Sequence, residues 1–285
     1  MARSTGQRLL AFDRRLGVRF VAGADEAGRG SLAGPLVVAG VLFDYEALRG
    51  PRVRPLASLN DSKQVSPAER EVLFETVMAC ASQVSVRMVS ALEIDRSGLH
   101  RCNLGGLRAV LGDLHPTADA CLVDGFRLGP TAPPHRAVVD GDARSAAIAA
   151  ASIVAKVVRD RVMRRFDALY PRYGFVSHVG YITPAHTEAV RAFGPSELHR
   201  RSFQAACYEA MADASRSPSP GRELAARGSD GGAAARLQTP GPVSRREAHA
   251  RGGDAERRPS EWELPRRARS RIRTSEIEAS AIETA

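Results

Sequence analysis

The sequence predicts an α/β fold, in which helices flank a central sheet, over residues 19–205 of a 285-residue chain. Short apolar runs that are typical of buried strands alternate there with longer segments that carry helix-capping signals. The hydrophobic fraction of 44% is enough for one sizeable core. No stretch of about 18 uninterrupted apolar residues occurs, so we expect no membrane span. Residues 1–18 are interpreted as a short N-terminal lead-in.

Five strands are predicted, each from a short apolar or alternating run. The first two runs contain small residues between the large ones and are close in sequence, so we expect neighbouring strands. The third alternates in polarity, and the last two are short and apolar. The predicted strands cover residues 20–25, 35–43, 83–89, 119–123 and 135–139.

The predicted helices begin at capping signals. Ser66 and Glu69 have capping-box spacing, with proline at the first helical position, and start a helix to about residue 81. Ser90 and Glu93 repeat that spacing before a helix to about residue 114, broken at residues 97–98. A long amphipathic helix is expected over 143–169, and another from Thr183 to about 193.

The last 80 residues have a different composition. Residues 206–285 contain only seven Leu, Ile, Val or Phe and are rich in Ala, Arg, Ser, Gly, Pro and Glu. Such a segment buries too little apolar surface to offset its chain entropy, so we predict a disordered, low-complexity tail. Trp262, in a short helix around 260–264, could anchor an unidentified partner, or the whole tail could be an unselected solvated segment.

Charge and cysteine content exclude several classes of protein. The four cysteines lie far apart and form no CxxC pair, which argues against zinc ribbons and redox pairs and favours a reducing, cytoplasmic location. The net charge of +9 suits a polyanionic partner. Of 41 basic residues only Lys63 and Lys156 are lysine. Codon bias toward arginine could produce this skew. The two lysines would then need a reason of their own, because ammonium and guanidinium groups are not interchangeable.

Four carboxylates stand out by position. Asp25 and Glu26 end the first predicted strand and Asp124 ends the fourth, and open α/β sheets build their sites at such strand ends. Asp160 interrupts the apolar stripe of the long helix, where an acid needs a pair or a metal. Together they suggest an all-oxygen site for a hard cation.

Each acid also has a simpler interpretation. Asp124 could belong to an ordinary Asp-Gly turn, and Lys156 and Asp160 could form an i,i+4 helix pair. The first two acids could simply end a strand. Glycines crowd around those two acids and allow close approach of a ligand to the backbone, or only a tight hairpin. The residues alone leave these alternatives open.

Six ordered motifs resemble ribonuclease HII. Residues 23–41, GADEAGRGSLAGPLVVAGV, are similar to the signature of that family. LNDSK at 59–63, LVDG at 122–125, AAASIVAKVVRD at 149–160, YGFVSHVGY at 173–181 and GPSELHRRSF at 194–203 follow in the expected order. The resemblance covers about residues 17–204. It implies a ribonuclease H-like fold, with a mixed central sheet flanked by helices and a small helical C-terminal portion.

The resemblance also implies a metal-dependent reaction. The family's four metal-site carboxylates map onto Asp25, Glu26, Asp124 and Asp160, which would hold two Mg²⁺ or Mn²⁺ ions. The implied activity is endonucleolytic hydrolysis 5′ to ribonucleotides, giving 5′-phosphomonoesters. The implied substrates are RNA–DNA hybrids and duplex DNA that contains single ribonucleotides, which connects the protein with DNA repair and replication.

Substrate contacts are implied for eight further residues. Backbone groups of the Gly-Arg-Gly turn would contact the ribose 2′-hydroxyl, and a tyrosine would bond the same hydroxyl and stack on the next sugar. A polar loop and the two lysines would meet phosphates. These residues are Gly28, Arg29, Gly30, Tyr181, Asn60, Ser62, Lys63 and Lys156.

Some features remain outside the motifs or depart from them. The basic helix face formed by residues 159, 161, 164 and 165 is interpreted as a solvated surface. Val179 stands where the family often has Lys, and Ile182 where a small residue is common. We expect a monomer. A non-catalytic hybrid-binding protein, or another nuclease or integrase on the same fold, are the alternative functions.

Overall fold

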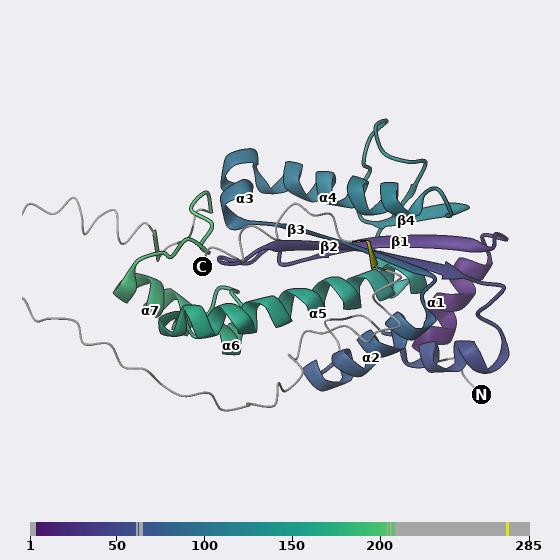
Figure 1. Ribbon diagram of the computed structural model, residues 1–285, viewed down its shortest axis with the longest axis horizontal. Helices are drawn as coiled ribbons and strands as arrows, with labels where there is room; N and C mark the ends of the chain where they lie inside the picture. Colours follow the sequence, from purple (N-terminus) through teal and green to yellow (C-terminus); the bar gives the residue numbers. More distant parts are fainter. Residues whose placement is uncertain are drawn as a thin grey trace, which may run out of the picture.

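A mixed sheet forms the centre of the molecule (Figure 1). The structure is a computed structural model, which describes residues 4–60, 62, 65–203, 205, 207–208 and 272–273. Within these residues the strand order is β5-β4-β1-β2-β3-β6. β1 pairs antiparallel with β2 and parallel with β4, so the mixed sheet is confirmed. The strands are β1 (Phe20–Ala27), β2 (Leu36–Asp44), β3 (Gln83–Val89), β4 (Ala120–Asp124), β5 (Arg136–Val138) and β6 (Ile272–Arg273).

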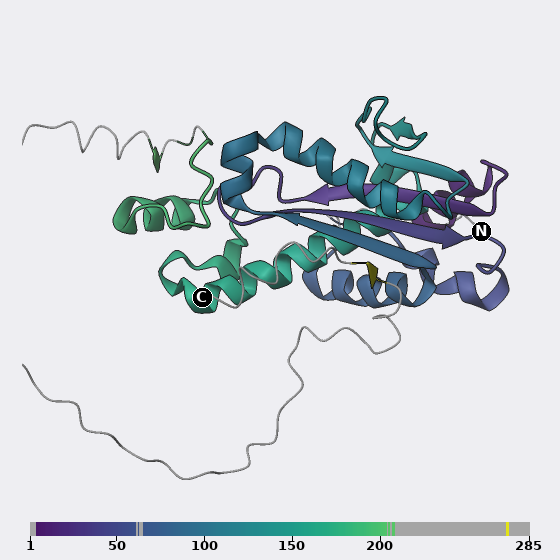
Figure 2. The ribbon, with the colours of Figure 1, turned by 45° about the horizontal axis from the view of Figure 1, so that its top comes forward.

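Helices cover both faces of the sheet, as Figures 1 and 2 show. One face carries α3 (Ala91–Ser97) and α4 (Leu99–Leu114). The other carries α1 (Thr5–Arg14), α2 (Pro67–Cys80) and α5 (Ala146–Leu169). The short α6 (Phe175–His178) and α7 (Pro184–Phe193) lie at one end, beside the C-terminal half of α5. The predicted fold class, including its small helical C-terminal portion, is therefore confirmed.

β2 is buried on both faces, and its side chains alternate between two cores. Val37 and Val41 belong to the core under α5, while Val38 and Leu42 belong to the core under α4. A strand covered on both sides reads as a continuous apolar run because neither face meets water. This explains why the sequence showed an unbroken run here and an alternating one at β3, which is partly exposed.

The capping signals mostly predicted the helix starts. Ser66 and Glu69 form the full reciprocal capping box of α2. At α3 the Ser90 hydroxyl caps Glu93 N–H, but the Glu93 carboxylate accepts a bond from the Ser97 hydroxyl. α5 begins three residues later than predicted, because residues 141–143 form a separate 3₁₀ turn and Ser145 caps the helix.

The N-terminal segment is part of the core rather than a lead-in. Ser4 and Gln7 form a capping box that starts α1, a spacing the sequence interpretation overlooked. Leu9 and Leu10 of this helix are buried. Two further 3₁₀ segments, Gly50–Ser58 and Pro171–Tyr173, were also not predicted.

The predicted C-terminal boundary of the catalytic domain is also wrong. Ala205 and Cys207 are buried in a third apolar cluster with Phe175 and Val190, so the predicted boundary after residue 205 cuts through packed structure. The rest of the predicted disordered tail, including Trp262, lies outside the described residues except for β6, which pairs parallel with Val84 and Ser85. In the described part of the chain, no helix has the length and apolarity needed to cross a bilayer.

Candidate active site

Three of the four predicted carboxylates lie at the carboxyl ends of β1 and β4. Ala24 pairs with Val123, so Asp25 and Asp124 follow side by side on parallel neighbours, and Glu26 comes next on β1. Asp124 Oδ1 accepts a bond from Gly141 N–H at 2.7 Å, which fixes that side chain. The strand-end prediction therefore places these acids correctly relative to the sheet.

Close packing of α5 against β1 completes this part of the site. A Cβ at Gly23 would lie 2.2 Å from the carbonyl carbon of Ala147, so only glycine lets the helix approach so closely. The approach brings Ser152 of α5 into hydrogen-bond contact with Asp25. Ser62 Oγ lies 2.9 Å from Ser152 Oγ, which links the predicted polar loop to the carboxylates.

The carboxylates repel one another. Asp25 is only 5% exposed. Its burial, followed by the charges of Glu26 and Asp124, raises its pKa well above the ordinary value of an aspartate. A divalent cation would relieve both effects, and oxygen ligands are those that Mg²⁺ and Mn²⁺ prefer. By chemistry and charge these three acids fit such a cation.

Asp160 is held differently. Lys156 Nζ donates to its Oδ1 at 2.7 Å, and Arg70 Nη1 lies 3.7 Å from its Oδ2. The simpler i,i+4 interpretation of Lys156 and Asp160 is thus confirmed as a contact. Among the described residues, no three His, Cys, Asp or Glu side chains are close enough together to form a ready-made metal site.

The Gly-Arg-Gly turn lies directly after the acids of β1. Gly28 has a φ of +86° and a Cβ there would lie 1.9 Å from Arg159 Nε, so the position admits only glycine. Arg29 and Gly30 are exposed. The Arg29 guanidinium lies 3.9 Å from Glu26 and over the ring of Phe126. The turn therefore presents its last two residues to solvent beside the carboxylates.

Tyr181, in the segment after α6, lies near Lys156 and the segment that follows the Gly-Arg-Gly turn. Lys156 Nζ and Arg159 Cζ lie 5.0 and 5.1 Å from its ring centroid. Gly180 C=O accepts from Ala33 N–H at 3.1 Å, which joins the tyrosine loop to the segment after the Gly-Arg-Gly turn. The structure thus brings together the acids, the turn, Lys156 and Tyr181.

The predicted phosphate-binding loop is only partly described. Ser62 is buried, and its carbonyl accepts from Arg70 Nε at 2.8 Å, so its contacts point toward the site interior. Asn60 is half-buried. Lys63 lies outside the described residues. Substrate contact by this loop stays a prediction.

The prediction of a solvated basic face is wrong for Arg159. This side chain is fully buried and donates to the carbonyls of Ala33, Pro35 and Val179. Arg200 is equally buried and donates to the carbonyls of Arg29 and Gly34. Burial lowers the pKa of both, that of Arg200 to about 9 with a further contribution from Arg159.

Two other arginines of that face are paired with acids of α2. Arg161 pairs with Glu71 and Glu75, and Arg164 pairs with Glu71. These partly exposed pairs contribute about 0–1 kcal/mol each to stability. They join α5 to α2, while Arg164 and Arg165 are exposed.

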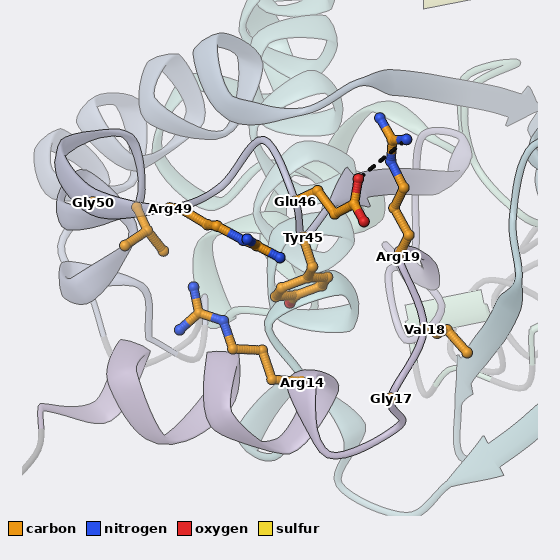
Figure 3. A pocket seen from close by; sticks show the side chains of 9 residues that line it. Arg14, Gly17, Val18, Arg19, Tyr45, Glu46, Arg49 and Gly50 are labelled. Atoms are coloured by element: carbon orange, nitrogen blue, oxygen red, sulfur yellow. Dashed lines mark ion pairs between the residues drawn. The ribbon is translucent and has the colours of Figure 1, made fainter.

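A basic hollow lies at the opposite end of β1 from the acids. Figure 3 shows Arg14, Arg19 and Arg49 around Tyr45 and Glu46, in a cavity of about 600 Å³. Arg19 is paired with Asp44 and Glu46, and Arg14 donates to Leu48 C=O. Because these residues precede β1 and follow β2, the hollow is not part of the candidate active site.

The sheet is ribonuclease H-like, and two of its central strands end in carboxylates. This combination is typical of a class of nucleases. Comparison with known proteins gives the family: the profile of ribonuclease HII matches residues 22–206. The ribonuclease HII of Geobacillus thermodenitrificans is 43% identical over 205 residues, which are 71% of this chain and 76% of that protein. The chain therefore belongs to the ribonuclease HII family, and it is a hydrolase, an endonuclease of ribonuclease H type.

Solved structures agree with the fold. The ribonuclease H2 of Pyrococcus horikoshii is 26% identical, with a TM-score of 0.59 over 70% of this chain and all of that chain. A Bst ribonuclease HIII solved in complex with Mn²⁺ is 20% identical, with a TM-score of 0.52 over 74% of this chain and 73% of that one. The second likeness supports the fold alone.

Proposed function

We propose that this protein cuts the phosphodiester bond 5′ to ribonucleotides, both in RNA–DNA hybrids and at single ribonucleotides within duplex DNA. One observation carries the proposal: acids of β1 and β4 lie beside a Gly-Arg-Gly turn whose last two residues are exposed. The tyrosine loop is hydrogen-bonded to the segment that follows this turn. Acids suit phosphodiester hydrolysis, and the turn and the tyrosine suit recognition of a ribose.

Asp25, Glu26 and Asp124 are the side chains that would hold divalent cations, Mn²⁺ or Mg²⁺, with Asp160 as the fourth ligand. The chemistry that two such cations supply is activation of water and neutralisation of phosphate charge. Ser152 orients Asp25 by its hydrogen bond. Lys156 contacts Asp160 and lies against the ring of Tyr181, so it can offer its ammonium to a substrate phosphate.

The 2′-hydroxyl is the group that distinguishes a ribonucleotide from a deoxyribonucleotide. In this proposal backbone groups of residues 28–30, of which Arg29 and Gly30 are exposed, contact that hydroxyl. Tyr181 bonds the same group and stacks on the next sugar. The product is a 5′-phosphomonoester, and the biological role is ribonucleotide removal during DNA repair and replication, by a cytoplasmic monomer.

The test is incision of a DNA duplex that carries one ribonucleotide, with Mn²⁺, with Mg²⁺ and with chelator. We expect a single cut 5′ to the ribonucleotide with metal and none with chelator. An all-DNA duplex of the same sequence is the control. Binding of the duplex without incision under either metal would favour the non-catalytic alternative and refute the proposal.

A further inference from the structure

Three histidines lie buried behind Tyr181, and the proposed chemistry uses none of them. His186 and His199 are 0% and 2% exposed, and His178 is 8% exposed. The rings of His178 and His186 stack with centroids 4.3 Å apart. All three pack against the ring of Phe175.

Hydrogen bonds fix the proton positions on these rings. Ser196 N–H donates to His199 Nδ1 at 3.0 Å, so the proton of His199 is on Nε2. That Nε2–H faces His186 Nε2 at 3.1 Å, which must accept. The proton of His186 is therefore on Nδ1, and it donates to the backbone carbonyl of Tyr181 at 2.9 Å.

The proton position on His178 follows from its hydrogen bonds in the same way. Gly180 N–H donates to its Nδ1 at 3.2 Å, so its Nε2–H donates to Tyr173 C=O at 2.8 Å. Its own backbone carbonyl accepts from Tyr181 N–H. Tyr181 is thus held at its N–H by His178 and at its C=O by His186, while its ring rests against Lys156.

The arrangement works only with neutral rings. An added proton on His186 Nε2 would point at His199 Nε2–H, and one on His178 Nδ1 would point at Gly180 N–H. The surroundings favour neutrality, because burial, with smaller effects from neighbouring histidines, lowers the pKa of His186 and His199 to about 4. Near neutral pH the three protons therefore have one consistent arrangement.

We propose that His186 and His199 are positioning residues, which hold the backbone of Tyr181 so that its ring meets the sugar next to the cut. The inference rests on the proposed function, since it presumes the sugar contact of Tyr181. The histidine chain continues to Ser196, just before Arg200, whose guanidinium holds the carbonyl of Arg29. One segment, residues 196–200, therefore supports both elements that would contact the ribose.

The test is a double-mutant cycle on His186→Phe and Tyr181→Ala. For each variant, kcat/KM is measured on a single-ribonucleotide duplex and on a long RNA–DNA hybrid, and the ratio of the two values is compared. We expect His186→Phe to lower the ratio about five- to tenfold, which is the effect of losing the hydrogen bond to Tyr181 C=O. The double variant should have the ratio of Tyr181→Ala alone, because both changes disable the same contact.

Tyr173→Phe is the matched control. It removes a buried hydrogen bond of the same cluster, from Tyr173 to Gly194 C=O at 2.8 Å, without reaching Tyr181. We expect its ratio to equal that of the wild type. A control ratio as low as that of His186→Phe would mean that general destabilisation causes the effect, and would overturn the inference.

The outcomes separate this inference from the proposed function. If Tyr181→Ala keeps the wild-type ratio, the proposed sugar contact fails and the inference fails with it. If Tyr181→Ala lowers the ratio but His186→Phe does not, or lowers it additively, only the positioning role fails. Should His186→Phe not fold, ¹⁵N NMR of the wild-type imidazoles decides. We expect Nδ1–H on His186 and Nε2–H on His178 and His199 at pH 7, and any other pattern overturns the inference.

Discussion

Asp13 is a buried carboxylate whose ionisation should make the stability of this fold depend on pH. The carboxylate is fully buried, accepts from the Tyr45 hydroxyl at 2.7 Å and caps α5 through Ala147 N–H at 2.9 Å. Burial raises its pKa from 3.8 to about 6, although these hydrogen bonds lower it in part. Because the folded state holds the proton more tightly than the unfolded state, stability is greatest below pH 4 as far as this group is concerned. It is lost as the pH rises to about 6.

The magnitude follows from the shift. About two pKa units correspond to about 3 kcal/mol of unfolding free energy between pH 4 and pH 7. Asp13→Asn keeps an oxygen that can accept both hydrogen bonds and never ionises. We therefore expect the stability of the variant relative to the wild type to increase by up to about 3 kcal/mol over that range. A constant offset from imperfect packing does not affect this trend.

The assay is urea unfolding of both proteins from pH 4 to pH 8. Only the difference between the two proteins is used, because other groups titrate in the same window. His186 and His199 act in the opposite direction, since their lowered pKa values make stability fall as the pH drops from about 6.5 to about 4. A difference that does not change with pH, or that shrinks as pH rises, would refute the reasoning.

Three further predictions concern the site. Asp25→Asn should abolish incision while duplex binding by fluorescence anisotropy stays near wild type; retained turnover would show that the carboxylate site is misplaced. Lys156→Arg should lower kcat and raise the Mn²⁺ concentration needed for half-maximal rate, because a planar guanidinium can bind Asp160 with two hydrogen bonds; unchanged titration curves would show that Lys156 has no role that arginine cannot fill. Val179 has a φ of +43°, a strain of roughly 1–2 kcal/mol for a β-branched residue. Val179→Gly relieves this strain but adds chain entropy and loses the packing of a partly buried side chain against the third apolar cluster. We therefore expect the unfolding free energy to change by less than about 1 kcal/mol, and a larger change in urea would contradict this.

Local signals predicted most of the elements, since their causes lie within a few residues. The capping box at Ser66, the break at Gly98 and the apolar run of β2 each depend on neighbours in sequence. The acids at strand ends were predictable for the same reason. Capping-box spacing at Ser4 and Gln7 was equally available and would have found α1.

The buried arginines could not be predicted in this way. Arg159 stands in a basic helix face, and its burial depends on carbonyls of Ala33 and Pro35, more than 120 positions earlier. The lowered pKa of His199 likewise comes from burial and, to a smaller extent, from the ring of His186 on α7. Long-range partners of this kind leave no local pattern, so the sequence showed the acids of the site but not what supports the Gly-Arg-Gly turn and the Tyr181 loop beside them.

The loop from Gly28 to Pro35 is held by the guanidiniums of Arg159 and Arg200 through main-chain oxygens. Main-chain oxygens exist whatever the side chain, so the path of this loop does not depend on which residues stand at its exposed positions, Arg29 and Gly30. A Cβ at Gly30 would meet nothing within 4 Å. The protein thus offers a rigid frame with two replaceable positions beside its carboxylates. Libraries at these positions could select new sugar or backbone preferences without rebuilding the loop.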